Sequence, residues 1–209
     1  MINKKYYFRI ISLISLFTLF SCGGGGGDDS SSASNSANSG PSMTTGGFVS
    51  LCTGTSPSAA GAKDPLAGAS TGDPIIDNLV NMINAHRSAL SPPLPSLIIA
   101  EELYLTALGH SEDMDNQNYF LHNAPDGASV VDRVFDEGIA GADYFIIGEN
   151  LGKGSAYGDA ATLFTDWLNS TSHKANIENI DYTHHGIAYV IDEDGEYIWT
   201  HVFIKPNCS

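Results

Sequence analysis

Residues 185–204 read HGIAYVIDEDGEYIWTHVFI, and they carry the strongest structural signal of the chain. Two apolar runs, 185–191 and 197–204, flank Asp194-Gly195, a turn signal typical of paired antiparallel strands. Both runs are apolar at successive positions, so the sheet that they form has two apolar faces. Each apolar face needs a covering layer. The stretch therefore predicts a hairpin sandwiched between helices.

Four helices are predicted upstream of the hairpin, and they supply the covering layers. The spacing of apolar residues places them at about 73–90, 100–118, 130–137 and 159–169. Asp73-Pro74 opens the first with an N-cap and a proline at the first helical position, and Pro92 lies beyond its end. Residues 144–147 are a further short strand candidate. The pattern predicts an α/β (α+β) fold, a three-layer α-β-α sandwich around a small antiparallel sheet.

The first 21 residues have the organisation of an export signal. Lys4, Lys5 and Arg9 precede the apolar run 10–20. That run is shorter than the roughly 20 apolar residues of a spanning helix. Residues 19–22, LFSC, resemble the lipobox of bacterial lipoproteins, whose cysteine carries acyl chains. We expect removal of residues 1–21 and lipidation of Cys22, with an ordinary cleaved secretion signal as the alternative.

Residues 22–72 are predicted to be a flexible tether, because they are mostly Gly, Ser, Ala, Asn and Thr. The apolar patch 48–52 is the exception and is expected to dock on the domain predicted over 73–209. The lipid would hold the exported domain at a membrane. Gly23 replaces the aspartate that retains some lipoproteins in the inner membrane, which favours the outer membrane or cell surface.

Cys52 and Cys208 are the cysteines that remain besides Cys22. Two leftover cysteines often pair in an oxidising compartment. A disulfide would place their Cα atoms within roughly 7 Å. Two free thiols are the alternative.

The charge is strongly acidic, with a formal net value of −15 at pH 7. Removal of residues 1–21 takes Lys plus Arg from 9 to 6 and leaves Asp plus Glu at 24, so the mature charge is about −18. Such a surface repels phosphate backbones and anionic head groups. The charge therefore argues against nucleic acid as a partner.

Polar segments between the apolar elements carry a family resemblance. They are HSEDM (110–114), YFLH (119–122), GENL (148–151), WLNSTSHKANI (167–177) and YTHHGIA (182–188). In this order, the chain resembles the bacterial branch of the CAP superfamily over about 78–206. That superfamily is also called SCP-like, and it includes cysteine-rich secretory proteins, insect antigen 5 and plant pathogenesis-related proteins.

The resemblance implies a cleft with two histidines and two acidic residues. By motif, three of these fall on His122, Glu149 and His173, while Ser170 stands at the second glutamate position. The predicted ligand cleft therefore consists of His122, Glu149, Ser170 and His173. We expect His122, Glu149 and His173 to converge within about 8 Å.

These three residue types have a recognisable chemistry. Two imidazoles and one carboxylate suit a divalent metal with water at an open position, and Zn²⁺ is the expected occupant. Zinc-bound water supports hydrolysis near neutral pH. Without metal, Glu149 beside a histidine is a candidate general base, which makes Glu149 and His173 candidate catalytic residues. No His-Glu-x-x-His helix occurs in the sequence.

Each candidate also has a structural interpretation. Glu149 would brace a glycine-flanked turn at 148–154, and His173 would cap the segment after the fourth helix. His110 is expected to be a hydrogen-bonded structural histidine. Asn150 and Asn176 are expected to satisfy loop backbone groups. The strand histidines 184, 185 and 201 leave open whether they extend a metal site, and His201 should share a face with Trp199 and Phe203.

Three functions stay open from the sequence. The favoured one is an extracytoplasmic, lipid-anchored binding module for a small ligand, lipid, glycan or protein, because no shared reaction unites the family that the chain resembles. The second is a metal- or Glu149-dependent hydrolase, such as a peptidase or cell-wall enzyme. The third is a purely structural envelope protein. The sequence leans away from an enzyme without deciding the question.

Overall fold

The computed structural model of the chain describes residues 71–139 and 146–205. The predicted signal peptide, nearly all of the predicted tether, Cys22 and the predicted Cys52–Cys208 pair lie outside the described residues. Within the two described ranges, no helix combines the length and the apolar character that crossing a membrane requires. Thr71 is buried, and its Oγ1 donates to Asp77 Oδ1 at 2.8 Å. Thr71, two residues ahead of the predicted domain boundary, therefore already packs on the domain.

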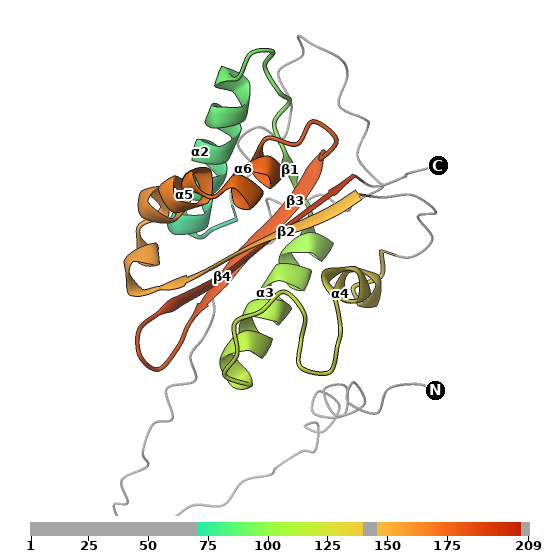
Figure 1. Cartoon of the computed structure of the whole chain (residues 1–209), viewed down its shortest axis with the longest axis vertical. Helices are drawn as coiled ribbons and strands as arrows, with labels where there is room; N and C mark the ends of the chain where they lie inside the picture. The colour runs from blue at the N-terminus through green and yellow to red at the C-terminus, as the bar shows by residue number, and fades with distance from the viewer. Residues whose placement is uncertain (1–70, 140–145, 206–209) are drawn as a thin grey trace, which may run out of the picture. The chain divides into compact units, whose positions relative to one another are not determined.

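The sheet of the described region has four strands in the order β1-β3-β4-β2 (Figure 1). Their bounds are β1 Ile98–Ile99, β2 Ile146–Gly154, β3 His184–Ile191 and β4 Tyr197–Lys205. β4 pairs antiparallel with both β3 and β2, and β1 is parallel to β3. Gly195, in the turn between β3 and β4, has a φ of 80°, a conformation that glycine adopts without strain. The predicted hairpin is confirmed.

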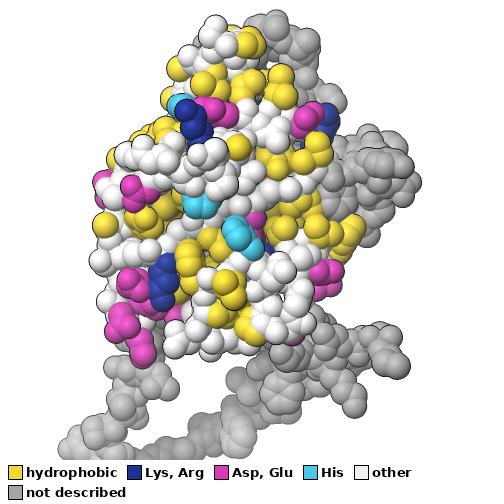
Figure 2. Space-filling model, viewed as in Figure 1, with side chains coloured by type: hydrophobic (Ala, Val, Ile, Leu, Met, Phe, Trp, Pro, Cys, Tyr) yellow, Lys and Arg dark blue, Asp and Glu magenta, His cyan; other side chains and the backbone are white. Residues whose placement is uncertain are grey.

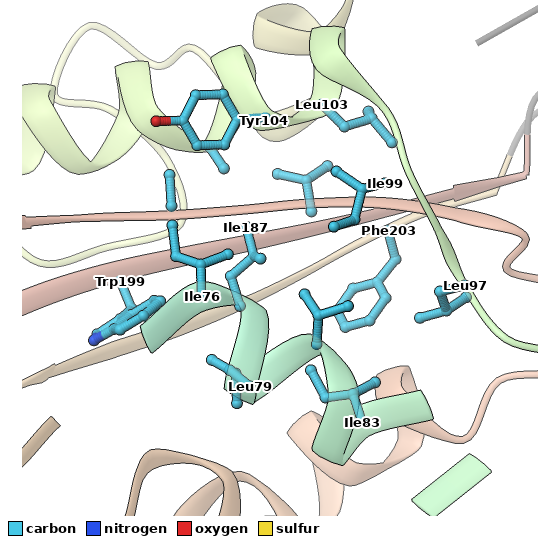
Figure 3. Packing of buried hydrophobic residues seen from close by; sticks show 14 of the residues in the cluster. Ile76, Leu79, Ile83, Leu97, Ile99, Leu103, Tyr104, Ile187, Trp199 and Phe203 are labelled. Carbon is cyan, nitrogen blue, oxygen red and sulfur yellow. The ribbon is translucent and has the colours of Figure 1, made fainter. Parts of the chain in front are cut away.

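Helices cover both faces of this sheet. Their bounds are α2 Pro74–Ala89, α3 Glu101–Asn116, α4 Val130–Asp136, α5 Ala160–Asn169 and α6 Thr171–Ile177. Figure 3 shows Leu103 and Tyr104 of α3 on one side of the strands, and Ile76, Leu79 and Ile83 of α2 on the other. α4 contacts α3, whereas α5 contacts α2 and α6. The predicted three-layer α-β-α arrangement is therefore confirmed.

The two faces of the sheet are packed in different ways, one through a glycine and the other through large aromatic side chains. On the α3 side, a Cβ at Gly186 would collide with the backbone of Leu103 and Tyr104, so glycine lets α3 lie directly against β3. On the opposite side, Trp199 and Phe203 of β4 are fully buried in the core that they share with α2 (Figure 3). Successive side chains of β4 point to opposite faces of the sheet, so its apolar run contributes to the packing on both faces, as the sequence indicated.

Strand β2 corrects one prediction. The sequence suggested a short strand at 144–147 and a turn at 148–154, whereas residues 146–154 form one strand paired with β4 along its whole length. The glycines of this segment mark close packing and not a turn. A Cβ at Gly148 would collide with Tyr182, and one at Gly152 would collide with Leu163 of α5.

Three short elements escaped prediction, the first being the 3-10 turn η1 Ser155–Gly158 that follows β2. β1 is only two residues long, and its parallel pairing with β3 makes the sheet mixed where a wholly antiparallel one was expected. α6 follows α5 directly, with Ser170 serving as the C-cap of α5 and the N-cap of α6. Ile177 is the one buried residue of α6, so the helix has no apolar stripe that its sequence could reveal.

Arg87 fastens α2 to the end of α6. Its guanidinium is fully buried and donates to the carbonyl groups of Pro95, Ile177 and Asn179 at 2.8, 2.7 and 2.9 Å. Burial lowers the pKa of Arg87 to about 10, so it stays charged at neutral pH. Carbonyl groups at a helix C-terminus lack partners within the helix and attract cations. Arg87 therefore holds in place the helix that carries His173.

Candidate functional site

The site is organised around the carboxylate of Glu149 on β2. Its side chain is only 3% exposed. Oε1 lies 2.8 Å from Nδ1 of His122, and Oε2 lies 2.6 Å from Nη2 of Arg133. Both oxygens are thus bonded to basic side chains, as a buried carboxylate requires.

His122 lies in the segment between α3 and α4, and its side chain is 58% exposed. A carboxylate oxygen can only accept, so the 2.8 Å contact means that Nδ1 carries the proton. Nε2 is left as the ring atom available to a ligand. Two contacts hold the backbone beneath the ring: His110 Nε2 lies 3.1 Å from the Leu121 carbonyl, and Arg133 donates to the His122 carbonyl at 3.1 Å.

Charge and burial affect the two candidate histidines in opposite directions. The hydrogen bond with Glu149 raises the pKa of His122, against the smaller opposing effects of burial and of Arg133. Burial, followed by the charge of His122, lowers the pKa of His173. Because the charge of His122 acts on His173, the two rings belong to one electrostatic environment. Figure 2 shows two exposed histidine side chains near one another in the middle of the viewed face.

His173 lies in the first turn of α6, and its ring meets Trp167 edge-on with centroids 6.4 Å apart. Two amide side chains link α6 to β2. Asn150 Nδ2 donates to the His173 carbonyl at 3.1 Å, and Asn176 Nδ2 donates to the Glu149 carbonyl at 3.2 Å. Glu149 and Asn150 are neighbours on β2, so their side chains point to opposite faces of the sheet. Glu149 thus contacts His122 from one face of this edge strand, and Asn150 contacts the main chain of His173 from the other.

The predicted set is brought together in part. His122 and Glu149 are in direct contact, whereas the convergence of His173 with them within 8 Å stays a prediction. The Ser170 hydroxyl lies 3.3 Å from that of Ser172, at the junction of α5 and α6. Within residues 71–139 and 146–205, no three His, Cys, Asp or Glu side chains are positioned together as metal ligands. Both oxygens of Glu149 are instead bonded to His122 and Arg133.

The structural interpretations have mixed outcomes. The bracing role of Glu149 is wrong, because its carboxylate bonds two side chains from within a strand. His173 lies within α6, the helix that directly follows α5, so it does come after the predicted fourth helix, and its ring packs against Trp167 of that helix. Asn150 and Asn176 do satisfy backbone groups, though these belong to a helix and a strand. His110 is fully buried and hydrogen-bonded to the Leu121 carbonyl, as expected of a structural histidine.

The strand histidines 185 and 201 lie in the interior. His185 Nδ1 and His201 Nε2 are 2.8 Å apart, and both side chains are fully buried. Burial is the main cause that lowers the pKa of His185 to about 3 and that of His201 well below its usual value. His201 also packs against Trp167 of α5 and against Phe203. It shares a face of the sheet with Trp199 and Phe203, at alternate positions of β4, as predicted. His184 Nδ1 lies 2.8 Å from its neighbour Thr183 Oγ1.

Sequence reasoning missed Arg133. It is the only Lys or Arg between residues 88 and 152, which was the available signal. A carboxylate placed in an apolar strand needs a cation, and this stretch offers just one. The pairing of Arg133 with Glu149 depends on the tertiary contact between α4 and β2, which the sequence pattern does not show.

Comparison with known proteins places the chain in a family of bacterial relatives. The model of the cysteine-rich secretory protein family, CAP, matches residues 80–203. YkwD of Bacillus subtilis is 37% identical over 126 residues, covering 60% of this chain and 45% of that protein. The membrane protein YlbC of the same species is 40% identical over 99 residues, covering 47% of this chain and 26% of that protein. The chain thus spans less than half the length of these relatives.

Solved structures show the same fold. An extracellular SCP-domain protein from Bacillus anthracis is 29% identical with a TM-score of 0.52, over 61% of this chain and 39% of that one. An outer surface protein of Borrelia burgdorferi has a TM-score of 0.56 over 64% of this chain and 93% of that one. At 21% identity, this second likeness concerns the fold alone. Because the family model matches more than half of the sequence, the chain belongs to the cysteine-rich secretory protein family, CAP.

Proposed function

We propose that this CAP domain is an exported, lipid-anchored binding module in which His122 and His173 hold a divalent metal ion, zinc foremost. The observation that carries the proposal is the 2.8 Å contact of His122 Nδ1 with Glu149. A metal-binding histidine usually donates its other ring N–H to a carboxylate, which fixes the ring and makes it more basic. Glu149 fills that outer role for His122.

The residues present fit a metal in two further respects. His122 exposes its ring, and Nδ1 is occupied, so Nε2 is the nitrogen that faces a ligand. The lowered pKa of His173 favours the neutral imidazole, which is the form that binds metal. Glu149 is bonded through both oxygens and stays outside the first coordination sphere. Water or an oxygen atom of a bound partner would complete the coordination of zinc.

The location of this module follows from the N-terminal sequence of the chain and from its charge. The export signal and Cys22 favour anchoring at the outer membrane or the cell surface, with the acidic domain held away from anionic head groups. Two of the solved relatives are described as an extracellular and an outer surface protein. A small ligand, a lipid, a glycan or a protein would then bind at the exposed metal.

A hydrolase is the second candidate, and the His122–Glu149 pair is the observation that favours it. A carboxylate that orients an imidazole is the base half of many hydrolytic sites. Both oxygens of Glu149 are occupied, so the base would be Nε2 of His122, acting on a water molecule. This replaces the expectation that Glu149 itself is the base.

Zinc titration of the chain from residue 22, with Cys22→Ser, tests the metal proposal. Calorimetry should give one zinc per chain, and His122→Ala and His173→Ala should each weaken binding at least about 10-fold, because each removes a ligand. His86→Ala is the matched control, since His86 pairs with Glu178 at 2.8 Å elsewhere on the surface. Absence of binding at micromolar zinc, or binding that both variants keep, rejects the proposal.

Hydrolysis assays on peptides and peptidoglycan separate the second candidate from the first. A hydrolase should lose its activity in His122→Ala. No turnover by the zinc-loaded parent leaves the binding module as the function. Turnover that survives His122→Ala excludes this histidine as the base.

A further inference from the structure

Arg133 touches both halves of the site. Its Nη2 lies 2.6 Å from Glu149 Oε2, and Nη1 and Nη2 each lie 3.1 Å from the carbonyl oxygen of His122. Nη1 also lies 3.3 Å from the Ala128 carbonyl. One guanidinium therefore holds the carboxylate and, at the same time, the main chain of the histidine that this carboxylate holds.

The position of Arg133 is itself fixed by α4. Ser129 and Asp132 form a reciprocal capping box at the helix start, so the first turn is well defined. Val134, the next residue, is fully buried in the core. The Arg133 side chain is only 14% exposed. A side chain anchored in this way can set the geometry of its neighbours.

We propose that Arg133 is the positioning residue of the His122 site. Because Arg133 hydrogen-bonds to Glu149 and to the His122 carbonyl at the same time, it orients the imidazole. Nδ1 then donates to Glu149, and Nε2 faces the bound ligand. This inference rests on the proposed function for the identity of that ligand. The planar fork of arginine can serve two acceptors in fixed directions, which the single ammonium of lysine cannot do.

A simpler role would be to neutralise the buried carboxylate. The two roles differ in one variant. Glu149→Gln combined with Arg133→Gln removes the buried charge together with its partner, while the amide oxygen introduced at position 149 can still accept from His122 Nδ1. If Arg133 only neutralises, this double variant behaves like Glu149→Gln alone. If Arg133 positions His122, the double variant is worse, because the His122 carbonyl has lost its donor.

The experiment measures two quantities for each protein: zinc affinity, and the nitrogen chemical shifts of the His122 ring without metal. Arg133→Lys and Arg133→Gln should weaken zinc binding roughly 10- to 100-fold, as loss of outer-shell partners does. Their ring shifts should show that Nδ1 has lost its fixed hydrogen bond. The double variant should bind zinc at least about 10-fold more weakly than Glu149→Gln alone. The double variant also guards against misfolding, because no unpaired charge is left buried.

Lys153→Gln is the matched control. It removes another ion pair from β2, with Asp192 at 3.1 Å, at a position on the same strand as Glu149. Neither the zinc affinity nor the His122 ring shifts should change in this variant. The metal-free ring shifts keep the two proposals separate. A parent protein that fails to bind zinc contradicts the proposed function, whereas the ring shifts of the Arg133 variants still test the positioning role.

Two results overturn the inference. One is a double variant whose zinc affinity and His122 ring shifts equal those of Glu149→Gln alone. That result would mean that Arg133 serves only as a counter-ion. The other is parent-like ring shifts in Arg133→Lys, which shows that a positive charge without the fork is sufficient.

Discussion

Glu149 divides its two carboxylate oxygens between His122 and Arg133, and this division decides what each residue can do. A carboxylate bonded at both oxygens is a poor direct metal ligand and a poor base. It is well suited to hold a proton on Nδ1 of His122 and thereby to free Nε2. In the site that we propose, the exposed imidazole is the ligand-binding group, and the carboxylate bonded to it supplies the orientation.

The protonation of His122 is the first prediction at this scale. The hydrogen bond with Glu149 raises its pKa above the usual 6.5, so Glu149→Gln should lower the NMR titration midpoint relative to the parent. Zinc competes with the proton for the ring, so zinc affinity should rise with pH through that midpoint. A parent midpoint at or below 6.5, or one that Glu149→Gln leaves unchanged, contradicts the assigned hydrogen bond.

The sequence revealed His122, Glu149 and His173 through motif order, and it did not reveal Arg133. Motif residues can be recognised because a family motif has a fixed order of residue types along the sequence. An ion pair depends on where folding places a helix relative to a strand, and α4 and β2 are separate elements with a connecting segment between them. Only the lack of any other Lys or Arg between 88 and 152 pointed to Arg133.

At the scale of the elements, close contact between α3 and β3 depends on one glycine. The Cβ of Gly186→Ala would meet the backbone of Leu103 and Tyr104, which cannot move aside as a side chain can. We expect a loss of about 3 kcal/mol or more in the free energy of unfolding, at the upper end of overpacking effects. Urea unfolding monitored by circular dichroism measures it.

Gly109→Ala is the control for this prediction. Gly109 lies in α3, and among the described residues a Cβ added there would meet no heavy atom within 4 Å beyond its own helix backbone. Alanine should therefore stabilise the helix by roughly 0.5–1 kcal/mol. Equal effects of the two substitutions would show that α3 and β3 are not packed as described.

Elements with a strong apolar period were predictable, and those shaped by contacts were not. The bounds of α2 and of the β3–β4 hairpin follow from capping residues, apolar spacing and a turn dipeptide within the segments themselves. The glycines of β2 suggested a turn, because from sequence alone a glycine needed for close packing looks like one needed for bending. α6 had too few apolar residues to show a period.

At the scale of the whole molecule, three buried histidines make the fold sensitive to acid. Burial is the main cause that lowers the pKa of His110 to about 4 and that of His185 to about 3, and it lowers the pKa of His201 as well. Below about pH 6.5, these imidazoles bind protons in the unfolded chain, whereas they stay neutral in the folded chain. The free energy of unfolding therefore falls as pH falls, by up to about 1.4 kcal/mol per pH unit for each ring, until the folded-state pKa is reached.

His110→Gln tests this dependence. Glutamine keeps a donor for the Leu121 carbonyl and cannot titrate, so the variant should lose less stability than the parent between about pH 6.5 and 4.5. Urea unfolding at several pH values in that window measures the difference. His86→Gln, at a half-buried histidine, is the control. Identical losses in the parent and in His110→Gln would contradict the neutral, buried state of His110.

We propose that a metal ion is held by the imidazoles of His122 and His173, with Glu149 outside its first coordination sphere. X-ray absorption spectroscopy at the zinc edge of the zinc-loaded chain tests it most directly. We expect two imidazole nitrogens at about 2.0–2.1 Å, one of which disappears in His122→Ala and the other in His173→Ala. A zinc spectrum without imidazole, or one that neither variant alters, would contradict it.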